Sequence, residues 1–404
     1  MSHSKHWDAI VIGLGVVGSS ALAELARSGL EVLGLDRWSP PHPQGSSGGG
    51  DTRIIRLAYA EDDAYLPLLE LSYHQWRELE AEGGESILER CGCLTIGPTD
   101  GELIAGIDQT AERHGLAVER LGADEIASRF PLFRPGGDFV GRLDPAAGFL
   151  RVDPALKSLL ARAVGAGAEV QGGVVVDGWE RGEDGALTVR AGDRSFHADR
   201  LVVAAGAWMP RLLEPLAAHL DVRRQPVFWF EPGAAAGAEA LAPDGLPTLI
   251  WEHEPRRFVY GFPIRPRGLK IAIHHEGEAT TADSVDRELR DADVERVLEI
   301  TERHMPGGYG ALRHADVCLY TNTPDGHFVI DRHPEVPEIA FASACSGHGF
   351  KLAPAVGAAL ADLTLGRDCR IPLGDFSLAR LTADSDRSPR RIRGGSRDFR
   401  GESR

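Results

Sequence analysis

The chain of 404 residues is 43% apolar and 26% charged, a composition typical of a globular protein with about two or three domains. Its formal net charge of -16 at pH 7 argues against nucleic acid as a partner, because a phosphate backbone is bound by a positive surface. The arginine-rich end at 384–404 has almost no apolar residues and is typical of a disordered basic tail.

The N-terminus lacks the charged and apolar segments of an export signal, and no apolar run reaches the roughly 20 residues that span a bilayer. We therefore expect a cytoplasmic protein without a membrane partner, whose five cysteines are free thiols. Cys91 and Cys93 lack the second ligand pair of a zinc site, so no metal is expected.

The first elements of the chain predict a βαβ unit. An apolar strand at 8–13 is followed by a helix at 14–29 and by a second apolar strand at 30–36. This order places a glycine-rich turn between a buried strand and a helix, which is the context of a Rossmann-like nucleotide-binding domain.

The turn carries a spacing that binds dinucleotides. Gly13, Gly15 and Gly18 form a G-x-G-x-x-G motif, which permits a tight turn, close approach of a diphosphate and close packing of helix on strand. Asp36 ends the second strand, where its carboxylate can accept hydrogen bonds from both ribose hydroxyls. The motif alone leaves NAD and FAD open, whereas the late apolar strand at 201–208 favours a flavoprotein.

The remaining elements alternate between helices and strand-rich passages, and no internal repeat is evident. A long Pro- and Gly-rich loop at 37–52 precedes them. We expect an α/β fold (α+β overall), in which the Rossmann-like domain is joined by a second domain with a mainly antiparallel sheet. Helices are expected at 65–84, 100–114, 152–170 and 291–307, and a strand, turn and helix at 338–366.

Four later stretches resemble the family of monomeric sarcosine oxidases and N-methyltryptophan oxidases, within the D-amino-acid-oxidase-like superfamily. They are PPHPQGSSGGGDTRIIRLAYAE at 40–61, YGFPIRPRGLKIAIHHEG at 260–277, VCLYTNTPDGHFVID at 317–331 and CSGHGFKLAP at 345–354. The resemblance implies an FAD-dependent enzyme that oxidises a secondary amine, usually an N-methyl amino acid. It also implies oxygen as the acceptor, hydrogen peroxide as a product and a monomeric protein.

The same resemblance implies two discontinuous domains. The FAD-binding domain would comprise residues 1–87, 151–221 and 319–380. The substrate-binding domain would comprise residues 88–150 and 222–318, and its sheet would cover the flavin.

Cys318 matches the family cysteine that joins the flavin 8α-methyl carbon through a thioether, so the resemblance implies a covalent FAD. One thiolate suffices for this attachment. Cys345 lies near the later turn and could compete for it, and Cys318 could instead be a buried structural residue. The resemblance also implies a set of residues that contact the cofactor, namely Thr52, Arg53, Gly347, His348, Gly349 and Lys351.

Several cations match residues that act on the substrate. Arg56 and Lys351 match the pair that binds the substrate carboxylate, and Arg53 matches a catalytic residue near the flavin ring. From the residues alone, Arg53 and Arg56 are three apart and would share one turn of a helix, and each cation could also be a surface charge.

Lys270 lies in a predicted strand, on the face that it shares with Ala272 and His274. By resemblance, Lys270 promotes the reaction with oxygen beside flavin N5, because a fixed positive charge stabilises superoxide. His274 and Tyr260 match residues of the substrate pocket with catalytic and binding roles.

One residue departs from the family pattern. Gly49 stands where the family has a histidine near the flavin, so the efficiency of flavin attachment or the flavin potential is expected to differ. The substrate side chain stays open, and a cyclic imino acid such as pipecolate or proline is an alternative substrate. Three further functions also stay open: a flavin dehydrogenase that uses a carrier, a nicotinamide dehydrogenase and a non-catalytic regulator.

Overall fold

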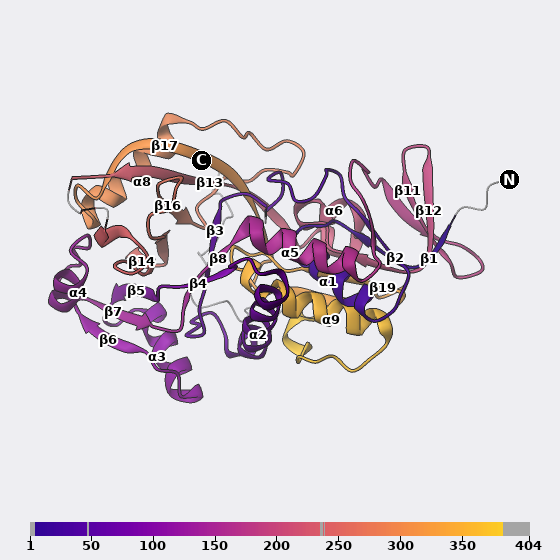
Figure 1. Cartoon of the computed structure of the whole chain (residues 1–404), viewed down its shortest axis with the longest axis horizontal. Coiled ribbons are helices and arrows are strands. Elements are labelled where there is room, and N and C mark those ends of the chain that lie inside the picture. Colours follow the sequence, from indigo (N-terminus) through magenta and orange to yellow (C-terminus); the bar gives the residue numbers. More distant parts are fainter. Residues whose placement is uncertain (1–4, 47, 235–236, 238, 383–404) are drawn as a thin grey trace.

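A computed structural model of the chain describes residues 5–46, 48–234, 237 and 239–382. The predicted basic tail at 384–404 therefore lies outside the described residues. Two sheets of eight strands and a small third sheet form the framework of the described part, and the two large sheets lie toward opposite ends of the longest axis (Figure 1). None of the helices described is long and apolar enough to span a membrane.

The first sheet is built on the predicted βαβ unit. Strand β1 pairs in parallel with β2 and β12, and β12 pairs in parallel with β19. The turns after β1 and β12 therefore lie together at the carboxyl ends of the parallel strands, which is where open α/β sheets bind ligands. The strands are β1 (His6–Ile12), β2 (Val32–Leu35), β9 (Glu169–Gln171), β10 (Gly178–Arg181), β11 (Leu187–Ala191), β12 (Arg194–Val203), β18 (Val329–Arg332) and β19 (Ile339–Ser343).

The second sheet is mainly antiparallel, in the order β17-β13-β16-β15-β14-β5-β7-β6. Only the β14–β5 pair within it is parallel. The predicted α/β fold class is thereby confirmed. The strands are β5 (Cys93–Pro98), β6 (Glu119–Gly122), β7 (Phe139–Asp144), β13 (Asp221–Pro232), β14 (Thr248–Glu254), β15 (Arg257–Gly261), β16 (Leu269–His274) and β17 (Tyr309–Asn322).

Helices surround both sheets, and the third sheet joins β3 (Thr52–Ile55), β4 (Leu88–Arg90) and β8 (Gly148–Arg151). Every helix expected from the sequence is present, and the shorter helices α4, α6, α7 and α10 are additional. The α-helices are α1 (Val16–Arg27), α2 (Leu66–Gly83), α3 (Glu102–His114), α4 (Ala123–Arg129), α5 (Val152–Gly165), α6 (Met209–Leu212), α7 (Glu214–Ala217), α8 (Asp291–His304), α9 (Ala353–Leu365) and α10 (Ala379–Thr382). Short 3-10 turns are η1 (Asp63–Tyr65), η2 (Gly206–Trp208), η3 (Glu239–Leu241), η4 (Phe350–Leu352) and η5 (Gly374–Phe376).

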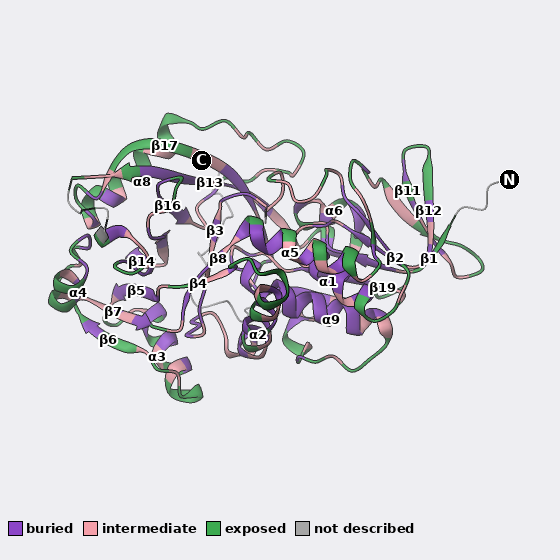
Figure 2. Cartoon of the chain, viewed as in Figure 1, coloured by how far each residue is buried: buried purple, intermediate pink, exposed green. Residues whose placement is uncertain are grey.

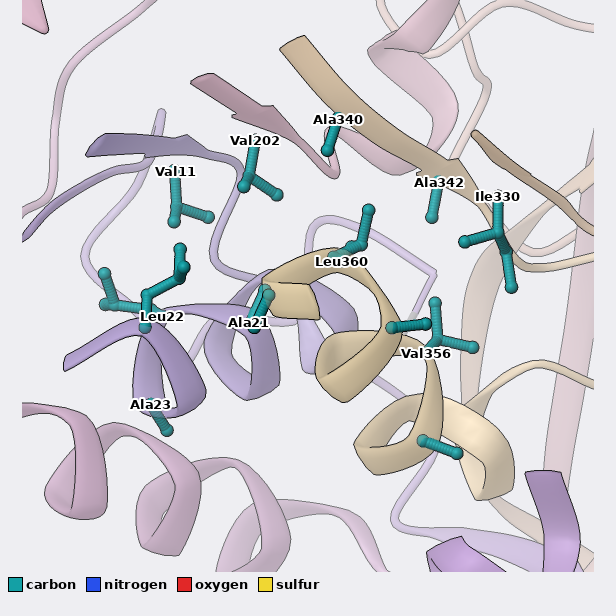
Figure 3. Close-up of a cluster of buried hydrophobic side chains, with 14 of the residues drawn as sticks. Val11, Ala21, Leu22, Ala23, Val202, Ile330, Ala340, Ala342, Val356 and Leu360 are labelled. Carbon is teal, nitrogen blue, oxygen red and sulfur yellow. The ribbon is translucent and has the colours of Figure 1, made fainter. Parts of the chain in front are cut away.

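Helices α1 and α9 pack side by side against the first sheet. Figure 3 shows Val11 of β1 above Leu22 of α1, with Leu360 of α9 beside them, and all three are fully buried. The two helices approach closely, since a Cβ on Gly357 would lie 2.4 Å from the Cβ of Ser20. Each buried aliphatic side chain contributes about 1.5–3 kcal/mol. This packing holds the start of α1 in place beneath the glycine turn.

The second sheet has two different faces. Leu269, Ile271 and Ile273 of β16 point into a core that α4 and α8 cover. Lys270, Ala272 and His274 point the other way, as the alternation predicted. Figure 2 shows that the outer part of β17 is exposed, whereas β13 beside it is buried. The face that carries Lys270 is therefore the one available for a site.

The expectation that Arg53 and Arg56 share a helical turn is wrong. Residues 52–55 form strand β3, which pairs with β8. The two guanidinium groups consequently point to different partners. Strand β17 also runs through to Asn322, so it crosses the proposed domain boundary at 318/319. The division into two domains remains a proposal.

Candidate active site

One continuous pocket contains both the glycine turn and the predicted substrate residues. It runs between the edge of the first sheet and the Lys270 face of the second. The residues that line it include Gly13, Gly15, Asp36, Arg53, Arg56, Tyr260, His274, Cys318, Gly347, His348, Gly349 and Lys351. Gly18, Thr52 and Lys270 lie outside the lining.

The glycine turn has the backbone that the motif predicts. Gly13 has φ +90°, and a Cβ there would lie 2.7 Å from the carbonyl oxygen of Ala204. A Cβ on Gly18 would lie 1.8 Å from the carbonyl oxygen of Gly13, so only glycine fits. Gly15 precedes α1 and provides no side chain that could cap it. The first amides of α1 are therefore left for an anionic ligand such as a diphosphate.

Asp36 is held firmly at the end of β2. Its carboxylate accepts the backbone N–H of Leu14 at 2.7 Å and of Trp38 at 2.9 Å. His42 lies 3.0 Å from it through Nε2. Each carboxylate oxygen has two acceptor positions, so Asp36 keeps capacity for a ribose hydroxyl.

A second acid, Asp283, which the sequence did not single out, accepts hydrogen bonds from several side chains at the nucleotide end of the pocket. Asp283 accepts from Arg37 at 2.5 Å, from Trp208 Nε1 at 2.9 Å and from Arg211 at 2.7 Å. All three donors line the pocket. The Trp208 hydrogen bond and the Arg37 hydrogen bond lower the pKa of Asp283 to about 2. The segment between β16 and α8 is thereby fastened to the nucleotide end.

Cys318 lies in the pocket wall on β17. It is 5% exposed and packs with Trp229 and Ala272. A Cβ on Gly49 would lie 3.6 Å from its sulfur, so the residue that departs from the family pattern is next to the thiol. Cys345 also lines the pocket, but burial raises the pKa of its thiol, and its sulfur accepts the N–H of Thr321 at 3.4 Å.

Lys270 is buried behind the pocket wall. Its ammonium donates to the carbonyl oxygens of Gly50 and of Thr52, the latter at 2.8 Å, and it lies 4.4 Å from the ring centre of Phe262. Burial lowers the pKa of Lys270 well below its usual value, and the charge of Arg53 adds to this effect. Arg53 itself donates to the carbonyl of Gly49 at 2.7 Å. Two cations thus converge on the segment 49–53.

Arg56 and Lys351 are brought together at the far end of the pocket. Nη2 of Arg56 donates to both carboxylate oxygens of Glu61, at 2.7 and 3.0 Å. Lys351 donates to the carbonyl of His348 at 2.8 Å and to the hydroxyl of Tyr59 at 3.3 Å. Burial lowers the pKa of Lys351 to about 7. Both cations are buried, so neither is the surface charge that the sequence had left open.

His274 and Tyr260 line the pocket side by side from the paired strands β16 and β15, and their rings meet edge to face with centres 5.8 Å apart. Nδ1 of His274 lies 3.0 Å from the hydroxyl of Tyr320. Burial lowers the pKa of His274 well below its usual range, so the ring is neutral at pH 7. A neutral imidazole beside phenol groups can orient an amine without competing for its proton.

Sequence reasoning missed Tyr59, Glu61, His275 and Tyr320. Glu61 is five residues after Arg56 and Tyr320 two after Cys318, so each lay inside a family-like stretch without a distinguishing pattern. His275 was inside another such stretch, and its φ of +63° is unusual for a residue other than glycine. Only the fold shows that Glu61, His275 and Tyr320 line the same pocket and that Tyr59 lies directly behind it, against Lys351.

Taken together, the pocket joins an anion site at the start of α1 with a buried two-cation site. A ligand that spans it would carry phosphate at one end and would meet a carboxylate-binding substrate site at the other.

Comparison with protein families matches residues 8–363 to the family described as FAD dependent oxidoreductase. The monomeric sarcosine oxidase of Streptomyces avermitilis is 38% identical over 384 residues, which cover 94% of this chain and 99% of that protein. The N-methyl-L-tryptophan oxidase of Salmonella dublin is 32% identical over 378 residues, with 93% and 99% covered.

Solved structures share the fold at lower sequence identity. NikD, an unusual amino acid oxidase essential for nikkomycin biosynthesis, superposes with a TM-score of 0.79 at 22% identity, covering 93% of this chain and 98% of that one. The L-proline dehydrogenase of P. horikoshii gives a TM-score of 0.79 at 20% identity, with 94% and 99% covered. At these identities the likeness concerns the fold alone.

Proposed function

Because the chain belongs to the FAD-dependent oxidoreductase family, with monomeric sarcosine oxidases and N-methyl-L-tryptophan oxidases among its relatives, we propose that it oxidises a secondary amine that carries a carboxylate. The product would be an imine that hydrolyses in water. The preferred substrate class is an N-methyl amino acid of the sarcosine or N-methyltryptophan type.

The residues of the pocket fit FAD. Gly13 has no room for a Cβ because the backbone of Ala204 lies against it, and the first turn of α1 has no side-chain cap. Asp36 offers a carboxylate for the ribose, and Cys318 offers a thiol in the wall farther along. Together these groups support FAD as the cofactor: the glycine turn and α1 would hold its diphosphate, Asp36 its ribose, and Cys318 would be joined to it through a thioether. FAD, when bound, supplies the hydride acceptor for amine oxidation and passes the electrons on to oxygen.

Each protein group has a part in this proposal. Arg56 and Lys351 bind the substrate carboxylate, because two buried cations compensate the loss of its hydration. Tyr260 and neutral His274 orient the amine, which arrives unprotonated, so no general base is required. Arg53 places positive charge at segment 49–53, and Lys270 adds to it when it is protonated; this charge would favour electron transfer to oxygen.

The observation that carries the proposal is the position of buried Arg56 and Lys351 in the same pocket as the dinucleotide turn. A nucleotide-binding regulator has no need for such a pair. Burying a cation without an anion beside it is costly. Arg56 is paired with Glu61, whereas Lys351 donates to the neutral oxygens of His348 and Tyr59, so a bound carboxylate would compensate the charge of Lys351.

The test is anaerobic mixing of the purified holoenzyme with sarcosine, N-methyl-L-tryptophan, L-pipecolate and L-proline. We expect one of the two N-methyl amino acids to bleach the flavin absorbance fastest, and readmitted air to restore it with one peroxide per turnover. Faster bleaching by a cyclic imino acid would change the substrate class. Restoration only by an added electron carrier would indicate a dehydrogenase, and no bleaching by any amine would refute the proposal.

A further inference from the structure

Tyr59 stands between the two cations of the proposed carboxylate site. Its ring centre is 5.0 Å from the guanidinium carbon of Arg56 and 5.0 Å from Nζ of Lys351. Tyr59 is 1% exposed and is not among the residues that line the pocket. It therefore touches both cations from behind, on the side away from a substrate.

The hydrogen bonds around Tyr59 have a defined direction. Nε2 of His348 is 3.3 Å from the carbonyl oxygen of Gly326, which can only accept, so this nitrogen carries the proton. Nδ1 of His348 is then a bare acceptor, and the hydroxyl of Tyr59 donates to it at 2.6 Å. The oxygen of Tyr59 is left to accept a hydrogen from Lys351 at 3.3 Å.

This direction requires a neutral His348. The ring is buried against Phe328, with their centres 4.7 Å apart. Burial and the charge of Lys351 lower the pKa of His348 well below its usual range. The imidazole consequently remains an acceptor for Tyr59 at ordinary pH.

The ammonium of Lys351 has three donors. One is taken by the carbonyl oxygen of His348 at 2.8 Å and a second by Tyr59. With two donors fixed by the protein, the third has a single direction. A backbone anchor alone would let the ammonium rotate, so the hydroxyl of Tyr59 decides where the remaining N–H points.

We propose that Tyr59, oriented by His348, is the positioning residue that fixes Lys351 beside Arg56 as a carboxylate clamp. This inference rests on the function proposed above. Tyr59 acts through Lys351 and the aromatic ring supports both cations, so removing the hydroxyl alone affects the lysine and leaves the contact with Arg56.

The experiment uses the FAD-loaded enzyme and measures binding by the change in flavin absorbance. The ligands are propionate and its neutral counterpart propionamide. In Tyr59→Phe we expect about tenfold weaker binding of propionate and less than twofold change for propionamide. For the oxidised amine, KM should rise about tenfold while kcat changes less than twofold.

Tyr65→Phe is the matched control. Tyr65 is also fully buried, its ring centre is 5.4 Å from that of Tyr59, and its hydroxyl accepts the N–H of Phe328 instead. We expect less than twofold change in the affinity for propionate. An equal loss in both variants would show a general effect of the aromatic cluster and overturn the inference.

A double-mutant cycle tests whether Tyr59 acts through Lys351. In a Lys351→Met background, Tyr59→Phe should have no further effect on propionate binding. A further tenfold loss there would overturn the proposal. Should Tyr59→Phe fail to fold, His348→Leu removes the acceptor while keeping the hydroxyl, and about threefold weaker propionate binding is expected; unchanged binding would contradict the proposal.

The controls separate this inference from the proposed function. A native enzyme that prefers propionate to propionamide but oxidises no amine would refute the function and leave the clamp standing. A native enzyme without that preference would refute the clamp.

Discussion

The nucleotide end and the substrate end of the pocket are built in different ways. At the nucleotide end, Gly13, Gly15 and Asp36 come from one βαβ unit, and their positions follow from hydrogen bonding between neighbouring elements. At the substrate end, Tyr59 and Lys351 are 292 positions apart in the sequence and meet only through the fold.

This difference has a physical basis. A turn between β1 and α1 needs particular backbone angles, so its glycines are visible in the sequence. A buried cation needs compensation, and the partners that provide it can come from any element. Local motifs therefore specify the cofactor end, whereas packing specifies the substrate end.

The largest effect is expected from a substitution that disrupts the glycine motif at the nucleotide end. Gly18→Ala would place a Cβ within 1.8 Å of the carbonyl oxygen of Gly13, and backbone would have to move. We expect loss of flavin binding and a free energy of unfolding lower by at least about 1–3 kcal/mol. Visible absorbance of the purified protein and chemical denaturation would measure the two effects.

Gly165→Ala is its matched control, since a Cβ there meets nothing within 4 Å. Flavin content and stability should remain as in the native protein. Normal flavin content in Gly18→Ala would show that the turn tolerates more movement than its packing indicates.

The next effect concerns electron transfer to oxygen. Lys270→Met removes the buried amino group that is to carry this charge, and we expect flavin reoxidation to slow about 10²–10³-fold, while reduction by substrate changes little. Stopped-flow absorbance separates the two half-reactions. Lys157→Met, an exposed lysine paired with Asp153, should change neither. Unaltered reoxidation in Lys270→Met would refute the role proposed for this lysine.

A smaller effect is expected from pH at the substrate end. Burial lowers the pKa of Lys351 to about 7, so this lysine is charged below pH 7 and loses its proton above it. Affinity for propionate should therefore be constant at low pH and fall by up to about tenfold per unit above pH 7. For Arg56, burial opposes the charge, yet Glu61 raises its pKa overall, so it stays charged throughout.

Measurements of propionate affinity from pH 6 to 8.5 test this dependence. Neighbouring His348, His274 and His275 all have lowered pKa values and stay neutral across this range. In Lys351→Met the slope should vanish. A slope that persists there would assign the titration to another group.

The smallest effect is expected from a substitution that restores the family's histidine beside the thiol of Cys318. Gly49→His would place an imidazole next to Cys318, whose sulfur is 3.6 Å from the Cβ position. We expect the rate of covalent flavin attachment to increase by about two- to tenfold, because a cationic or polar neighbour favours the thiolate. The yellow fraction in acid-precipitated protein measures it.

Two cysteine variants accompany this measurement. Cys318→Ala should abolish the precipitated yellow colour and Cys345→Ala should leave it. Colour that survives in Cys318→Ala would place the attachment elsewhere, with Cys345 as the first candidate because it lines the same pocket.

The sequence predicted the βαβ unit, the α/β class and most of the helices, because each depends on local periodicity and turn residues. It did not predict β3, where tertiary pairing with β8 outweighs the helical spacing of Arg53 and Arg56. Nor did it predict Tyr59 or Glu61, because an aromatic or acidic residue in a loop has no pattern of its own. The roles of the site residues came from resemblance, and they remain predictions.

The ion pairs of Asp283 and the Arg56–Glu61 pair differ in exposure, and this difference gives the two ends of the pocket different sensitivities to ionic strength. The partners of Asp283, Arg37 and Arg211, have side chains that are 33% and 55% exposed, so salt screens these ion pairs. The Arg56–Glu61 pair, at 6% and 15%, is largely shielded from solvent ions. Moderate salt should therefore loosen the segment between β16 and α8 at the nucleotide end before it disturbs the arginine at the substrate end.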